Sequence, residues 1–151
     1  MNGSSRIEKL GPPALKVSGF QFWVHGREFP DMDDYHDGNW LRMTAYCDEE
    51  AWISGSYITA VEMQGWLKFC EDLAKGHDET AELEFLEPEL EIQLTNKPDR
   101  KIEMVVTISH QPYEQKHRCK YKFATSALAR MIQDLKTIVS KYPVRGTPEE
   151  C

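Results

Sequence analysis

The residues best suited to chemistry lie in one acidic segment, from Phe29 to Leu41. Four aspartates and no Lys or Arg occur between Pro30 and Leu41. Apolar runs on both sides predict strands, so we expect a loop carried on a sheet, where binding surfaces commonly lie. A concentrated negative loop predicts a cationic partner, which is a metal ion, a basic ligand or a basic protein. The predicted partner-binding residues are Asp31, Asp33, Asp34, Tyr35, Asp37, Asn39 and Trp40.

A metal ion is the first alternative, because the segment supplies carboxylates and the imidazole of His36. The EF-hand pattern fails, however. Counted from Asp33, its third position is Tyr35 and its twelfth is Thr44, where acidic or amide ligands and a Glu are required. Short Asp, Asn and Gly runs also form turns by bonding their own backbone. We therefore predict no metal site, and keep a small-ligand or cation-binding module as the alternative function.

Catalysis has no comparable signature in the chain. The five histidines are scattered, and no nucleophile elbow, zinc-protease motif, phosphate-binding loop or dinucleotide fingerprint occurs. A cluster of glutamates could suggest acid–base chemistry, but its alternation with apolar residues is typical of an exposed sheet face. These glutamates are Glu82, Glu84, Glu87, Glu89 and Glu91. We predict no catalytic residues, no cofactor and no enzymatic activity.

The charge is unevenly distributed along the chain. The net charge is −7, but residues 1–96 carry 19 acids against 7 bases, and residues 97–145 carry 4 acids against 11 bases. An acidic first half argues against nucleic acid as the main ligand, because phosphate is bound by Lys and Arg. The basic last third can offset the acidic part within one fold or contact an anion locally.

Nothing in the sequence indicates export or a membrane. The apolar runs are far shorter than the roughly 20 residues of a membrane helix, and no apolar segment follows the start of the chain as in a signal peptide. The four cysteines, Cys47, Cys70, Cys119 and Cys151, form no C-x-x-C pair and are widely separated. A reduced, cytoplasmic protein is therefore predicted.

Hydrophobic periodicity predicts one α+β domain over residues 15–144, with disordered tails at 1–14 and 145–151. Period-two alternation predicts strands, and the change to helical spacing after the Thr59/Glu62 capping box predicts a first helix. Thr125 or Ser126 is expected to cap the second helix. The predicted strands cover 15–24 with a bend at Gly19, 40–46, 52–57, 81–86, 89–94, 102–108 and 120–123, and the helices cover 60–75 and 127–142.

This order, β-β-β-α-β-β-β-β-α, predicts an antiparallel sheet of about six to seven strands with two helices packed on it. Short connections disfavour a parallel sheet. The core stripes are expected at Met63, Trp66, Leu67, Cys70 and Leu73 in the first helix, and at Leu128, Met131, Ile132, Leu135, Val139 and Tyr142 in the second. The two strand-to-helix junctions resemble each other, which is compatible with a distant duplication.

Three blocks of sequence, in this order, form a recognisable pattern. The first joins Phe29 to Asp31 and then Asp37 to Leu41, the second runs from Glu84 to Leu90, and the third is Ile108 to His110 followed by a strand and a helix ending near Tyr142. Together these blocks resemble the WapI-type immunity proteins of bacteria. The resemblance implies an immunity protein that blocks a contact-dependent toxin made by the same cell, a tRNA-cleaving nuclease in the founding case. It supplies no catalytic residue and leaves the partner and the oligomeric state open.

An acidic loop suits that implied role. A nuclease domain is basic because it holds nucleic acid, and an inhibitor with acidic groups gains association rate and specificity against it. We therefore expect a non-enzymatic protein whose acidic surface neutralises a basic toxin.

Overall fold

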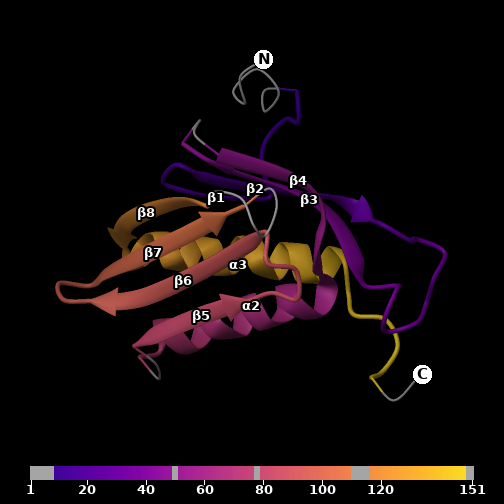
Figure 1. Cartoon of the computed structure of the whole chain (residues 1–151). Coiled ribbons are helices and arrows are strands. Elements are labelled where there is room, and N and C mark those ends of the chain that lie inside the picture. Colours follow the sequence, from indigo (N-terminus) through magenta and orange to yellow (C-terminus); the bar gives the residue numbers. More distant parts are fainter. Residues whose placement is uncertain (1–8, 49–50, 77–78, 110–115, 149–151) are drawn as a thin grey trace.

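Each half of the chain folds into a four-stranded antiparallel sheet followed by a helix (Figure 1). The computed structural model describes residues 9–48, 51–76, 79–109 and 116–148. The first half contains β1 (Leu15–Val17), β2 (Phe20–Arg27), β3 (Trp40–Cys47), β4 (Ala51–Thr59) and α2 (Ala60–Ala74). The second contains β5 (Thr80–Glu84), β6 (Leu90–Lys97), β7 (Lys101–Ile108), β8 (His117–Ala124) and α3 (Thr125–Lys141). Strands pair in chain order within each sheet, so both halves share one topology.

The α+β class, the antiparallel pairing and the two helices are confirmed. The strands form two sheets of four rather than one of six to seven, and the predicted order holds with one further strand. The extra strand arises because the segment 15–24 does not bend at Gly19 but reverses there, and Val17 pairs with Phe20. Ser18 supplies the left-handed backbone at φ 51°. The turn shifts the apolar alternation by one position, from Leu15 and Val17 to Phe20 and Phe22. A bend at Gly19 accounts for the same shift, so the pattern did not distinguish the two.

The two helices begin in different ways. The predicted capping box of α2 is confirmed: the Glu62 backbone N–H donates to Thr59 Oγ1 at 3.1 Å, and the Thr59 N–H donates to Glu62 Oε1 at 2.9 Å. The predicted cap of α3 by Thr125 or Ser126 is wrong, because its N-cap is Ala124. The N–H of Thr125 instead donates to the carbonyl of Arg100 in the β6–β7 turn, at 3.2 Å. A tertiary backbone partner thus replaces a side-chain cap.

The core lies where both helices meet both sheets. The apolar stripes predicted for α2 and α3 are confirmed as buried or half-buried, and Ile138 joins them. Trp66 of α2 is fully buried; its ring meets Phe22 of β2 edge-on at 5.4 Å between centroids and Phe85, just after β5, at 6.3 Å. Trp66 therefore connects the first sheet to the second half of the chain. At the helix–helix contact, Cys70 Sγ lies 3.8 Å from Met131 Sδ.

Contacts extend past both predicted ends of the domain. In the predicted N-terminal tail, Gly11 accepts a hydrogen bond from the indole N–H of Trp23 at 3.1 Å, and Ala14 donates to Phe22. In the predicted C-terminal tail, Arg145 makes several contacts with the acidic segment, described below.

Candidate binding site at the acidic loop

The acidic segment is the connection between β2 and β3, as predicted. Its base is closed by a hydrogen bond from the Glu28 N–H to the Trp40 carbonyl, at 2.9 Å. The loop, residues 28–39, projects from one end of the first sheet, and the chain that follows α3 runs to the same end of the molecule (Figure 1). This end of the fold therefore brings together segments more than 100 residues apart in the sequence.

Asn39 lies at the base of this loop and is only 1% exposed. Its Nδ2 donates to the carbonyls of Tyr35 at 2.8 Å and Arg145 at 2.9 Å, and its Oδ1 accepts the Arg145 N–H at 2.8 Å. Its own carbonyl accepts the N–H of Ala60, the first residue of α2, at 2.8 Å. Asn39 was predicted to contact the partner, but in this structure it joins the loop, the C-terminal segment and the start of α2.

The side chain of Arg145 is hydrogen-bonded to the backbone of the loop. Its Nη1 donates to the carbonyl of Pro30 at 2.8 Å and to that of Met32 at 2.7 Å. The same nitrogen lies 3.9 Å from the carboxylate of Asp33, whose side chain is 93% exposed. The guanidinium therefore fixes the loop backbone, while the Asp33 carboxylate remains in solvent. Such an exposed ion pair contributes little stability by itself.

Arg27 makes a second cross-link at the end of β2. It donates to the Gly38 carbonyl at 2.8 Å and to the carbonyl of Pro143. Burial, together with the nearby Arg145, lowers the pKa of Arg27 from its ordinary value. The guanidinium groups of Arg27 and Arg145 thus lie at the base of an acidic loop, where they donate hydrogen bonds to backbone carbonyls.

Asp34 and Gly38 shape the turn inside the loop. Asp34 accepts the Asp37 N–H on its carboxylate at 2.9 Å and the Gly38 N–H on its carbonyl at 3.0 Å. A Cβ at Gly38 would lie 2.4 Å from the Met32 carbonyl oxygen, so only glycine permits this close approach. Asp34 is half-buried and therefore has a structural task in addition to its charge.

The outer surface of the loop carries charge and apolar side chains together. Asp31, Asp33, His36 and Asp37 are exposed. Phe29 and Met32 are 43% and 41% exposed, whereas Tyr35 and Trp40, the predicted aromatic anchors, are half-buried. Tyr35 packs edge-on against His36 at 5.5 Å. Phe29 and Met32 were not predicted as binding residues. A signal was present, because both are large apolar residues in a predicted loop and neither had a predicted position in the core.

Nucleophilic and metal chemistry find little support elsewhere. In the described ranges, no three His, Cys, Asp or Glu side chains converge as a metal-binding group. Burial raises the pKa of the Cys70 thiol to about 12 and raises that of Cys47 as well, which disfavours thiolates. His25 bonds to Thr44 at 2.8 Å, and burial followed by the charge of Arg42 lowers its pKa. His77 and His110 lie outside the described residues.

The three sequence blocks that resemble immunity proteins are connected by hydrogen bonds. The first block ends beside α2, where the backbone carbonyl of Asn39 accepts the N–H of Ala60. Glu62 in the first turn of α2 accepts the N–H of Leu86, in the second block, at 2.7 Å. Ser109 of the third block then donates to the carbonyls of Pro88 and Glu89 at 3.4 and 3.0 Å. The bond between Glu62 and Leu86 therefore joins the two halves of the fold, and the bonds of Ser109 lie within the second half.

Comparison with known proteins agrees with this arrangement. The model of the immunity protein WapI-like family matches residues 15–143. The chain belongs to the WapI-like immunity protein family. The match covers both sheets and both helices. No curated protein matches this WapI-like chain.

Among solved structures, this WapI-like protein is similar to MRP1/MRP2 of Trypanosoma brucei. The identity is 12% over 93% of each chain, and the TM-score is 0.47. So distant a likeness carries no functional argument. No helix in the described part of the WapI-like chain is both long and apolar enough to span a membrane.

Proposed function

We propose that this WapI-like protein neutralises a basic toxin domain, of the nuclease type, by binding it with the outer surface of the β2–β3 loop. The family match over residues 15–143 is the observation that carries the immunity role. The loop supports the choice of surface, because it displays charged and apolar groups on a fixed backbone. The proposed mode is stoichiometric binding in the cytoplasm rather than catalysis.

The loop exposes both kinds of residue that protein interfaces use. Phe29 and Met32 offer large apolar side chains that a partner can bury, and Asp31, Asp33 and Asp37 are exposed carboxylates in the same loop. In protein interfaces a few buried large side chains carry most of the binding energy, while rim charges mainly raise the association rate. A toxin surface with Lys or Arg around an apolar depression would complement this arrangement.

The loop is also fixed before the partner arrives. Arg145, Asn39 and Arg27 bond it to the C-terminal segment and to β2. A pre-ordered loop loses less conformational entropy on binding than a flexible one, so more of the contact energy appears as affinity. The cation-binding alternative lacks such support, because the exposed aspartates do not converge on a common point with a third ligand in the described chain.

The test first asks whether a neighbouring gene encodes a toxin domain, which is then co-expressed and purified with the protein. Co-expression should rescue growth. The triple variant Asp31→Asn, Asp33→Asn and Asp37→Asn should bind more slowly, with a weaker dependence on salt, while its melting temperature stays near that of the wild type. Asp34 is left intact because it forms the turn.

The matched control removes the same number of negative charges at positions outside the loop. Glu71→Gln, Glu79→Gln and Asp99→Asn lie outside the loop. The control should keep the wild-type association rate once the small effect of net charge is subtracted. Equal rates for the loop variant and the wild type would show that the loop is not the interface. Failure of the wild type to protect cells from that toxin would refute the immunity pairing itself.

A further inference from the structure

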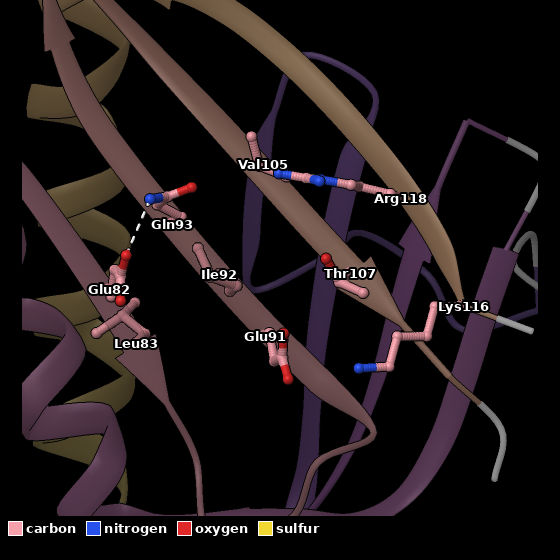
Figure 2. A pocket seen from close by; sticks show the side chains of 9 residues that line it. All are labelled: Glu82, Leu83, Glu91, Ile92, Gln93, Val105, Thr107, Lys116 and Arg118. Atoms are coloured by element: carbon pink, nitrogen blue, oxygen red, sulfur yellow. Dashed lines mark hydrogen bonds between the residues drawn. The ribbon is translucent and has the colours of Figure 1, made fainter. Parts of the chain in front are cut away.

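The second sheet has an open face on which two neighbouring rows carry acids at one edge and bases at the other. Helix α3 lies behind this sheet; in Figure 2 the polar side chains and Val105 stand on the opposite, solvent-facing side, whereas Leu83 and Ile92 belong to the core. Glu82 of β5 and Glu91 of β6 are exposed at one edge, and Arg118 and Lys120 of β8 are exposed at the other. Over the described residues, no acid of β5 or β6 forms an ion pair with a base of β8.

The strand register arranges these charges in rows across the sheet. One row is Glu82, Gln93, Val105 and Lys120, and the next is Glu91, Thr107 and Arg118. Both of these rows begin with an acid on the β5 side and end with a base on the β8 side. The two rows toward the β6–β7 turn differ, since one pairs Glu103 with Lys122 and the other pairs Lys97 with Lys101.

The centre of this face is hollow and is lined by both polar and apolar side chains. Val105 points to the open side yet is only 7% exposed, and Figure 2 shows the guanidinium of Arg118 extending over it. A hollow of about 490 Å³ lies between the acidic and basic edges. Glu82 bonds to Gln93 at 3.1 Å along its rim. The hollow leaves room for long side chains from a facing surface.

We propose that this face pairs with the same face of a second copy of the chain. A two-fold axis lying between the copies and parallel to the strands places β5 of one copy over β8 of the other. Because the axis is parallel to the strands, each row of one copy lies over the same row of the other. Glu82 therefore faces Lys120 of the second copy, and Glu91 approaches its Arg118. A two-fold axis perpendicular to the strands would instead put acid over acid. In these two rows the first arrangement is self-complementary, as a symmetric dimer requires, whereas at the β6–β7 turn it places Lys97 over Lys101 of the second copy.

The geometry sets the strength of this dimer. Two sheets pack about 10 Å apart, a gap that facing Glu and Lys or Arg side chains can span. Strands β6, β7 and β8 have eight residues each and β5 has five, so at about 4.8 Å between strands and 3.3 Å per residue the sheet covers roughly 450 Å² per copy. The total of about 900 Å² lies just below the roughly 1,000 Å² expected of a specific interface. We expect a reversible dimer with a dissociation constant on the order of 10–100 μM.

The test is sedimentation equilibrium of the full chain over a concentration series in about 0.1 M NaCl, where distant charges are screened but facing pairs are not. One variant, Glu82→Lys with Glu91→Lys, makes the face basic; a second, Arg118→Glu with Lys120→Glu, makes it acidic. Each should raise its own dissociation constant at least about tenfold, because like charges now face each other. An equimolar mixture of the two should recover association as a heterodimer, which misfolding of either variant could not produce.

The control, Lys68→Glu with Lys136→Glu, makes the charge change of the acidic variant on exposed positions of α2 and α3. It should dimerise as the wild type does. A wild type that stays monomeric up to about 1 mM would overturn the proposal, as would variants that dimerise normally or a mixture that fails to associate. A monomeric wild type whose face variants lose the toxin would assign this face to the toxin instead. The proposal does not depend on the loop being the toxin interface.

Discussion

The side-chain amide of Asn39 and the backbone of Arg145 bond to each other twice, across 106 positions of sequence. The amide donates to the Arg145 carbonyl and accepts from the Arg145 N–H, as a β-strand partner would. The C-terminal segment is thereby fixed against the base of the acidic loop. Because the backbone carbonyl of Asn39 also accepts the N–H of Ala60, the first residue of α2, one buried residue joins three parts of the fold.

Asn39→Asp tests that relationship with little change in shape. The new carboxylate would still accept the Arg145 N–H, but its other oxygen would face the carbonyls of Tyr35 and Arg145 with no proton to donate. We expect a loss of about 1–3 kcal/mol of unfolding free energy at pH 7, the cost of a buried unsatisfied polar group. Urea unfolding measures it.

The pH dependence of the same variant provides its control. Burial beside two carbonyls should raise the pKa of the new carboxyl, so protonation restores a donor and the deficit should shrink as pH falls through that raised pKa. A deficit that stays constant between pH 7 and about pH 4 would mean that the amide's donor role is unimportant.

Trp66→Ala should be the most destabilising substitution in α2. Trp66 is fully buried and touches rings from both halves of the chain. We expect a loss of about 3–5 kcal/mol, the usual cost of deleting a large buried aromatic side chain. Phe69→Ala on the same helix is the control, because that side chain is 39% exposed. Similar melting temperatures for the two variants would place Trp66 outside the core.

Glu62 connects the start of α2 to the segment after β5, so its carboxylate is more than a helix cap. One oxygen accepts from Thr59 and the other from the Leu86 N–H. In Glu62→Gln, one of these N–H groups would face an amide NH₂ group. We expect a loss of about 1 kcal/mol, the typical value of a cap. Glu71→Gln in the same helix should cost nothing measurable by thermal melting.

Glu62 should also contribute to the pH dependence of the unfolding free energy. Burial raises its folded-state pKa, although the hydrogen bonds from Leu86 and Thr59 oppose the shift. The folded protein therefore holds a proton that the unfolded chain has released, in the window above the ordinary carboxyl pKa. This contribution to stability is complete below that window and disappears as pH rises through the raised pKa. Glu62→Gln should remove that slope; an unchanged slope would assign it to other groups.

The sequence predicted what is local and periodic. The capping box of Thr59 and Glu62 lies within one helical turn, and the alternation from Leu90 to Leu94 needs only its neighbours to be recognised, so both were confirmed. The hairpin at Ser18 and Gly19 was missed because a bend at Gly19 accounts for the same one-residue shift in the alternation. The start of α3 was misassigned because its partner, Arg100, is supplied by the tertiary fold.

The candidate site was predictable in place but not in detail. The run of aspartates located the loop, since charge concentration is visible in sequence. The burial of Asn39 was not visible, because it depends on Arg145 at the far end of the chain. The exposure of Phe29 and Met32 could not be predicted for the same reason. Which apolar residues of the loop remain in solvent depends on the hydrogen bonds that join the loop to the C-terminal segment.

Phe29→Ala and Met32→Ala should separate binding from stability. Both side chains are already more than 40% exposed, so their removal should change the melting temperature little. If a toxin buries them as anchors, each substitution should weaken binding by about 1–2 kcal/mol or more, roughly 5- to 30-fold. The loss should appear in the dissociation rate, because apolar contacts form after the encounter, whereas the aspartates govern the association rate.

The measurement is surface binding of the cognate toxin domain, with both rate constants determined. Leu86→Ala is the control, since Leu86 is the most exposed large apolar residue in the described chain, at 75%, and lies outside the loop. Tyr35→Ala tests the anchor predicted from sequence and should have the smaller effect on binding, because Tyr35 is half-buried against His36. If the dissociation rate changes with Leu86 and not with Phe29 or Met32, the toxin binds beside β5 and the loop has only an electrostatic role.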